Sequence, residues 1–209
     1  PGPAARPPGG EGLAVAARGL AHEAKNALNA IVLKVELLLG SPGLDAGGGG
    51  AAEAHLAAIR DAARRLDDLV RRFAEVADPP GGATADAGGA AAGVAELLAP
   101  EARRRGIELA VAPAAGAWRV QAPPGVLNDL LLGLLARAVA ATPAGGRVTL
   151  RVSGRGGSVE TAVEREPAGP DRDAVQPSER AAAEALGGAL SVDREGAAER
   201  VRLLLPGAP

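Results

Sequence analysis

The 209-residue chain has no cysteine, no methionine and no tyrosine, and it has one tryptophan and one phenylalanine. Without cysteine there is no disulfide framework and no thiolate metal site, which fits a reducing compartment, so we expect a cytoplasmic location. Its two histidines lie far apart in the sequence and do not form a zinc pattern, so we predict no metal site. The missing methionine indicates that the initiator is absent and that the chain is a fragment or a processed product.

The chain also lacks a large excess of charge of either sign, and it lacks long apolar runs. The net charge is −2, and the lysines and arginines are spread along the chain, so there is no basic field for nucleic acid. No run approaches the roughly 20 apolar residues of a membrane span, because the most apolar stretch, 130–141, is interrupted by Gly133 and Arg137. These absences leave a core of Leu, Val, Ile and Ala and predict no membrane span in this chain.

Two segments in the first part of the chain have the apolar spacing of packed helices. From about residue 11 to 39, and again from about 51 to 77, apolar residues recur in alternating steps of three and four. A connection with Gly and Pro joins the segments, which predicts an antiparallel helical hairpin. One hairpin leaves half of a bundle uncovered, so we predict a homodimer with a four-helix bundle. The expected seam is Ala21, Ala24, Leu28, Ile31, Val35 and Leu38, with Leu56, Ile59, Ala63, Leu66, Val70, Phe73 and Ala77.

The pattern changes after a breaker-rich segment that contains two prolines and several glycines. We predict a disordered lead at 1–10, a helical hairpin domain at 11–77, a linker at 78–89 and an α/β domain at 90–209. The last range alternates helical and strand patterns, which predicts a two-layer α/β sandwich and an α+β fold class for the whole chain. The expected helices are 90–105, 124–141 and 178–186, and the expected strands are 107–112, 118–120, 147–152, 158–163, 189–192 and 200–204.

His22 is the first candidate functional residue. It lies one residue off the apolar seam, so it projects from the flank of the first helix. Asn26 and Asn29, four and seven residues later, share its face, and Glu23 lies beside it. The helix therefore offers an imidazole and two amides together. The arginines of the second helix, among them Arg65 and Arg72, are interpreted as a solvated face that could also touch a partner.

The segment around His22 resembles the phosphoacceptor box of two-component histidine kinases, His-Glu-x-x-Asn-Pro-Leu. Here it is His22-Glu23-Ala24-Lys25-Asn26-Ala27-Leu28, with Ala27 in place of the usual proline. The resemblance implies that His22 carries phosphate, that Glu23 holds one ring N–H and that Asn26 orients water for the reverse reaction. Lys25 and Asn29 are then candidate contacts of phosphate or partner.

The α/β range resembles the ATP-binding domain of the same kinases. The match rests on residues 130–138 with 142–150, which resemble the asparagine-box helix and the next strand, and on 186–192 with 202–206. In the family's asparagine box, Asn-Leu-Leu-x-Asn-Ala, the second asparagine coordinates the magnesium of ATP. The two asparagines fall on Gly133 and Arg137 here, and neither side chain can bind a cation. Sliding the match to Asn128 puts Leu132 in the second position.

The second nucleotide motif, Asp-x-Gly-x-Gly, is also altered. It normally follows a strand, but here the strand ends in Glu164-Arg165-Glu166-Pro167-Ala168-Gly169, and only Gly169 is retained. The expected lid, 171–177, is short and has no glycine to cradle phosphates. The sequence therefore predicts a domain that keeps the fold and has lost the nucleotide, so that ATP binding is doubtful and no cofactor is expected.

These observations favour a histidine phosphotransfer protein. His22 would pass phosphate between aspartates of response-regulator receiver domains, and the receiver would bring the magnesium. Two alternatives remain open at this stage: an active sensor kinase that phosphorylates His22 from ATP, and a non-catalytic scaffold that binds receivers.

Overall fold

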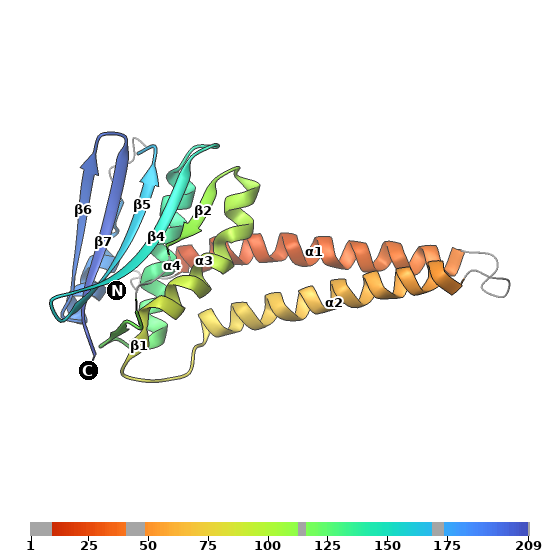
Figure 1. Ribbon diagram of the computed structural model, residues 1–209, viewed down its shortest axis with the longest axis horizontal. Coiled ribbons are helices and arrows are strands. Elements are labelled where there is room, and N and C mark those ends of the chain that lie inside the picture. Colours follow the sequence, from red (N-terminus) through yellow and green to blue (C-terminus); the bar gives the residue numbers. More distant parts are fainter. Residues whose placement is uncertain (1–9, 41–48, 113–115, 169–173, 209) are drawn as a thin grey trace, which may run out of the picture. The chain divides into compact units, whose positions relative to one another are not determined.

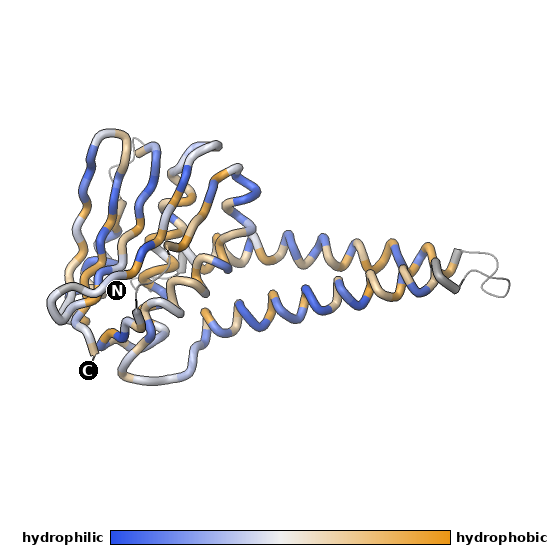
Figure 2. Tube along the Cα trace, in the orientation of Figure 1, coloured by the Kyte–Doolittle hydropathy of each residue, from blue (hydrophilic) through white to orange (hydrophobic). Residues whose placement is uncertain are grey.

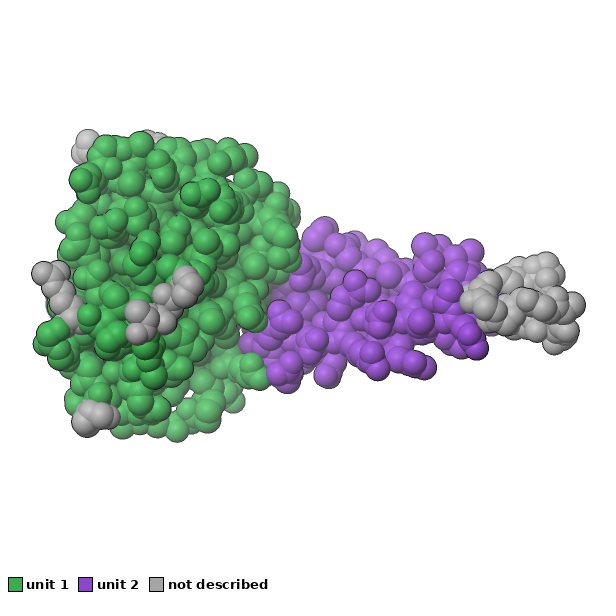
Figure 3. All heavy atoms as spheres, in the orientation of Figure 1, with its two compact units in different colours: residues 1–19, 74–209 green, residues 20–73 purple. Residues whose placement is uncertain are grey.

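The structure, a computed structural model, describes residues 10–40, 49–112, 116–168 and 174–208. The chain divides into two compact units, residues 20–73 and residues 1–19 together with 74–209 (Figure 3). Most of the predicted lead, residues 1–9, and the loop 41–48 lie outside the described residues. Gly10 is already the first residue of a helix.

The smaller unit is a hairpin of two helices. Helix α1 is Gly10–Gly40 and helix α2 is Gly49–Ala77, and from residue 20 to residue 73 the two run antiparallel (Figure 1). Alanine allows close helix packing here, since Ala62 is 1% exposed. The predicted helical hairpin is confirmed.

The predicted apolar seam of the hairpin is largely open to solvent in a single copy. Leu28 and Leu56 are each 52% exposed, and Val70 is 64% exposed. Hydrophobic and hydrophilic residues alternate along both helices (Figure 2). An apolar face of this kind, continuous over two helices, is typical of a surface that a further helix covers.

The larger unit is a five-stranded sheet covered on one face by helices (Figure 1). The strand order is β2-β4-β5-β7-β6, with β2 parallel to β4 and the other neighbours antiparallel. This is a two-layer α+β arrangement, as predicted. The strands are β2 Glu108–Val111, β4 Arg147–Arg155, β5 Ser158–Glu166, β6 Ala189–Glu195 and β7 Ala198–Pro206, and the helices are α3 Ala87–Arg104, α4 Pro124–Ala141 and α5 Pro177–Ala185.

The predicted linker 78–89 is partly ordered structure. Strand β1, Ala85–Asp86, pairs with β3, Arg119–Val120, and α3 begins at Ala87. Asp86 caps this helix, because its side chain accepts a hydrogen bond from the backbone N–H of Gly88 at 3.0 Å. The prolines and glycines of this segment favoured its interpretation as a linker, so neither the strand nor the helix cap was predicted. Trp118, next to β3, packs its ring directly against Gly154, where any Cβ would collide with it.

Helix α4 forms the centre of the larger unit. Pro124 is at its first turn, and Leu127, Leu130 and Leu131 are fully buried. By length and composition α4 is apolar enough to cross a membrane, and 56% of it is buried within the unit. The amide of Asn128 donates a hydrogen bond of 3.1 Å to the carbonyl of Val76 in the last turn of α2. Asn128 therefore caps a helix end rather than facing a ligand.

The first turns of α1 pack within the larger unit. A Cβ on Gly12 would lie 2.8 Å from the backbone carbonyl of Leu132, so glycine permits this close approach of two helices. Ala16 is completely buried, and Gly19 lies against Pro100 and Glu101. The compact hairpin is thus shorter at both ends than the predicted range 11–77.

Candidate functional site

His22 lies on the exposed surface of α1, in an unbroken helical segment. Lys25, Asn26 and Asn29 are exposed as well, and Glu23 is half-buried. Because residues three and four apart share a helix face, His22 lies next to Asn26 and Asn29. The helix therefore brings together the imidazole and the two amides of the predicted site, with the imidazole accessible to a partner.

A groove runs between α1 and α2 beside this face. Its volume is about 390 Å³, and it lies wholly within the smaller unit. Three of its lining residues are alanines, and five carry charged or amide side chains. Its lining residues are Glu23, Asn26, Ala27, Ala30, Ala62, Arg65, Asp68, Leu69 and Arg72. Two predicted site residues, Glu23 and Asn26, thus share the groove with α2 residues, whereas His22 is not among the lining residues.

The charges that line the groove balance, with Glu23 and Asp68 against Arg65 and Arg72. Asp68 accepts a hydrogen bond of 3.0 Å from Nη2 of Arg71. Arg65 uses its Nε to bond the carbonyl of Asp61 at 3.3 Å. Sequence reasoning took these arginines for a solvated face. Their spacing of seven residues, which puts them on one side of α2, is the signal that could have singled them out.

The face of α4 that should carry the asparagine box holds an internal ion pair. Nη2 of Arg137 donates a hydrogen bond of 2.6 Å to Oε1 of Glu179, whose side chain is 2% exposed. A Cβ on Gly133 would lie 2.5 Å from the same oxygen. The carboxylate of Glu179 therefore occupies the space in front of Gly133. Glu179 was not predicted as a partner of Arg137, which lies 42 residues before it in the sequence.

A second buried ion pair lies at the end of β5. Nε of Arg165 donates a hydrogen bond of 2.6 Å to Oε1 of Glu199, and the two side chains are 4% and 2% exposed. Arg194 donates to the other oxygen of Glu199 at 2.7 Å. Burial alone would raise the pKa of Glu199, but the hydrogen bonds from Arg165 and Arg194 outweigh it, so the pKa lies below its ordinary value.

A small cavity lies beside Arg137 of the first ion pair and the Arg165–Glu199 pair, among the residues that the structure describes. Its volume is about 10 Å³, and Arg137, Arg165 and Glu199 are among the residues that line it. That is about the space of one water molecule. The glycine of the altered second motif, Gly169, and residues 171–173 of the expected lid lie outside the described residues.

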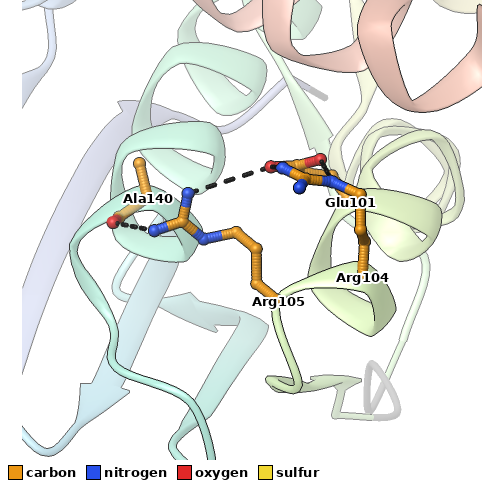
Figure 4. Close-up of polar contacts among 4 residues, drawn as sticks. All are labelled: Glu101, Arg104, Arg105 and Ala140. Atoms are coloured by element: carbon orange, nitrogen blue, oxygen red, sulfur yellow. Dashed lines mark hydrogen bonds and ion pairs between the residues drawn. The ribbon is translucent and has the colours of Figure 1, made fainter.

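A third charged cluster joins the ends of α3 and α4 (Figure 4). Arg104 donates two hydrogen bonds, of 2.8 and 2.6 Å, to Glu101. Arg105 lies 3.8 Å from Glu101 and donates a hydrogen bond of 2.7 Å to the carbonyl of Ala140. The hydrogen bond from Arg104 is the main reason why the pKa of Glu101 lies below its ordinary value. This cluster fixes the packing of two helices and offers no ligand site of its own.

The class of protein follows from the architecture just described: a helical hairpin and a helix-covered mixed sheet, with the histidine on the hairpin. No family model matches the sequence, and no curated protein matches it. Solved structures do match, among them histidine kinases and a catalytic domain of a histidine kinase. The chain is therefore histidine-kinase-like in its fold.

Three of these structures define the likeness. The catalytic domain of the histidine kinase ThkA has a TM-score of 0.53 and 14% identity, over 62% of this chain and 99% of that one. The Acinetobacter baumannii histidine kinase AdeS has a TM-score of 0.52 and 13% identity, over 90% of this chain and 98% of that one. Full-length ShkA in complex with AMPPNP has a TM-score of 0.50 and 27% identity, over 90% of this chain and 45% of that one. The predicted resemblance is confirmed at the level of fold.

Proposed function

We propose that this chain is a histidine phosphotransfer protein of a two-component relay, which carries phosphate on His22 between the aspartates of two receiver domains. The observation that carries the proposal is the exposed imidazole with Asn26 and Asn29 on one helix face, beside an open groove. The fold likeness to histidine kinases supports the same chemistry. The residues at the two positions of the asparagine box, Gly133 and Arg137, favour a relay over a kinase, because neither side chain can bind the magnesium of a nucleotide.

The proposed transfer needs one nucleophile and no group bound to the chain. A ring nitrogen of neutral His22 attacks the phosphorus of an aspartyl phosphate, so that a P–N bond forms while the P–O bond to the donor carboxylate breaks. Glu23 accepts a hydrogen bond from the other ring N–H and stabilises the positive charge that develops on the ring. The carboxylate of a second receiver then attacks the same phosphorus and releases the imidazole. The receivers supply the magnesium.

The groove would contact the receiver during both steps. Ala27, Ala30, Ala62 and Leu69 would supply apolar contacts there, and the charged side chains of both signs that line the groove would fix the orientation of the partner. Lys25 and Asn29 lie on the exposed part of the same helix and would contact the phosphoryl group or the partner.

The active form is proposed to be a homodimer with a four-helix bundle. The exposed fractions of Leu28, Leu56 and Val70 support a second copy on this face, since hairpins bury such surfaces by pairing. Location in the cytoplasm is proposed on the ground that the chain has no cysteine.

The test uses a receiver domain labelled with ³²P on its aspartate and an unlabelled second receiver. With the wild-type chain we expect label on the chain and then on the second receiver. With His22→Gln we expect neither, and with His55→Gln, which changes the other histidine, both steps continue. Label that reaches the second receiver through the His22→Gln chain contradicts the proposal.

Two alternatives have distinct outcomes in the same assay. If the chain is an autokinase, labelled ATP with magnesium and no receiver puts label on His22. If it is only a scaffold, the labelled receiver binds the wild-type chain but loses no label to it. The relay requires transfer from the receiver and none from ATP.

A further inference from the structure

Gly133 and Arg137, which depart from the asparagine box, are one helical turn apart on the same side of α4. Both face one carboxylate. Glycine at 133 leaves room for Oε1 of Glu179, since a Cβ there would lie 2.5 Å from it, and Arg137 binds that oxygen at 2.6 Å. One substitution thus provides the space and the other provides the charge.

Glu179 is held through both of its oxygens. Oε2 accepts a hydrogen bond of 2.7 Å from the backbone N–H of Gln176, which closes a capping box at the start of α5. Oε1 binds Arg137 of α4. Glu179 therefore caps the start of α5 and also links α5 to α4. Its side chain is only 2% exposed, so both contacts are shielded from water.

The second altered motif repeats the arrangement. If Gly169 is the last glycine of Asp-x-Gly-x-Gly, the position of its acidic residue is Arg165. Arg165 points to the helix-covered side of the sheet and pairs with the buried carboxylate of Glu199. At both altered positions an arginine has therefore gained a buried glutamate from elsewhere in the chain.

We propose that Glu179 and Glu199 are built-in anionic occupants of the pocket in which the resembling kinases hold a nucleotide. They pair with the two arginines, and through Glu179 they keep α5 closed on α4 without any ligand. The cavity that Arg137, Arg165 and Glu199 help to line has a volume of about 10 Å³. The inference goes beyond the relay and does not depend on His22: it holds or fails whether or not the chain transfers phosphate.

The main test is chemical rescue of Glu179→Ala in the full chain, with thermal unfolding followed by the fluorescence of Trp118, the only tryptophan. Removing one partner of a buried ion pair leaves a buried charge without its counter-ion, so we expect the unfolding temperature to fall by roughly 10 °C. Formate, a carboxylate small enough for the vacated space, should restore at least half of the loss at concentrations that leave the wild type unchanged.

The matched control is Glu108→Ala. Glu108 also pairs with an arginine, Arg147, at 2.9 Å, but both side chains are 60% exposed. We expect a shift of about 2 °C or less and no response to formate, because exposed pairs contribute little. Equal shifts for the two variants, or a loss in Glu179→Ala that formate leaves unchanged, overturn the proposal.

Two further variants test the same ion pair if Glu179→Ala does not fold. Glu179→Gln keeps the volume and removes the charge, and we expect a smaller loss of unfolding temperature in the same direction. The double variant Arg137→Met with Glu179→Leu removes both charges and should recover most of the loss, because an apolar pair of similar size replaces a buried ion pair well. Recovery no better than in the single variants contradicts a pairing role.

Hydrogen exchange tests the closed state of α5. In Glu179→Ala we expect the amides of α5 to exchange about tenfold faster or more, and in the wild type we expect exchange to be unchanged by MgADP. Binding of MgADP to the wild type with loss of protection in α5 overturns the proposal. Neither result bears on relay activity, which the receiver assay measures separately.

Discussion

The two units of the molecule differ in where they place ion pairs. The ion pairs described in the hairpin are exposed, as in Arg71–Asp68, where the side chains are 60% and 46% exposed. The α/β unit has exposed pairs as well, such as Arg147–Glu108 at 60% and 60%, but it also encloses pairs, as in Arg165–Glu199 at 4% and 2%. Exposed groups remain available to a partner, whereas enclosed pairs hold the fold together. The residues of the proposed transfer thus lie in the hairpin, whereas the buried ion pairs Arg137–Glu179 and Arg165–Glu199 lie in the α/β unit.

The largest expected effect is at His22. His22→Gln should lower transfer of label from a phosphorylated receiver by at least about 100-fold, because it removes the ring nitrogen that attacks the phosphorus in the proposed step. The unfolding temperature should be unchanged, since the side chain is exposed. Filter assays of label and circular dichroism measure the two quantities. A large loss of stability would mean that His22 is structural.

The next largest effect separates buried from exposed pairs. Glu199→Ala should lower the free energy of unfolding by about 3–5 kcal/mol, because it leaves Arg165 buried without this counter-ion. Asp68→Ala should lower it by less than about 1 kcal/mol. Urea titrations followed by Trp118 fluorescence and by circular dichroism measure these changes. Similar losses in the two variants would remove the contrast between the units.

The same carboxylate predicts a pH dependence. The pKa of Glu199 is below its ordinary value in the folded chain, so its contribution is fully present above the unfolded pKa, about 4.3, and is lost as the pH falls through the folded pKa. Unfolding of the α/β unit should therefore become easier as the pH falls below about 4.3. In Glu199→Gln this part of the dependence should disappear, which urea titrations between pH 3 and pH 6 would measure (a range set around the reference pKa).

The exposed apolar face of the hairpin leads to a prediction about the association of two copies of the chain. Val70→Glu should weaken association of two copies by about tenfold or more, because it places a charge in the surface expected to be covered. Ala57→Glu, on another exposed side of α2, is the matched control and should leave association unchanged. Sedimentation equilibrium measures both constants. Unchanged association in Val70→Glu would exclude this face as the dimer surface.

The smallest expected effect compares two glycines inside helices. Gly93→Ala should stabilise the chain by up to about 1 kcal/mol, since its Cβ would meet Val76 at an ordinary 3.5 Å. Gly133→Ala should destabilise it by about 1–3 kcal/mol, because its Cβ would collide with the carboxylate of Glu179. Urea titration of both variants gives the sign of each change. Stabilisation by Gly133→Ala would mean that the carboxylate moves away freely.

The sequence predicted those parts of the molecule that depend on local patterns. The helix Pro124–Ala141 was predicted to the residue, since Pro124 begins it and Pro143 follows its end. The placement of His22 with Asn26 and Asn29 followed from helical spacing alone. The roles of Glu23, Asn26, Lys25 and Asn29 in transfer remain predictions.

Partners that are distant in sequence could not be predicted. Glu179 carries a capping-box signal, but nothing in the sequence says that its other oxygen meets Arg137, because that contact depends on how α5 packs on α4. Strand β1 was missed because it has two residues and lies among glycines and prolines. The groove beside Asn26 depends on which sides of α1 and α2 face each other, which a periodic pattern on each helix does not define.

The trio of Gly133, Arg137 and Glu179 also has an evolutionary consequence. An asparagine at 133 would collide with Glu179, an asparagine at 137 would remove the cation that Glu179 binds, and an alanine at 179 would remove the carboxylate that Arg137 binds. Each single change is therefore expected to give a less stable protein, so the three positions are constrained to change together.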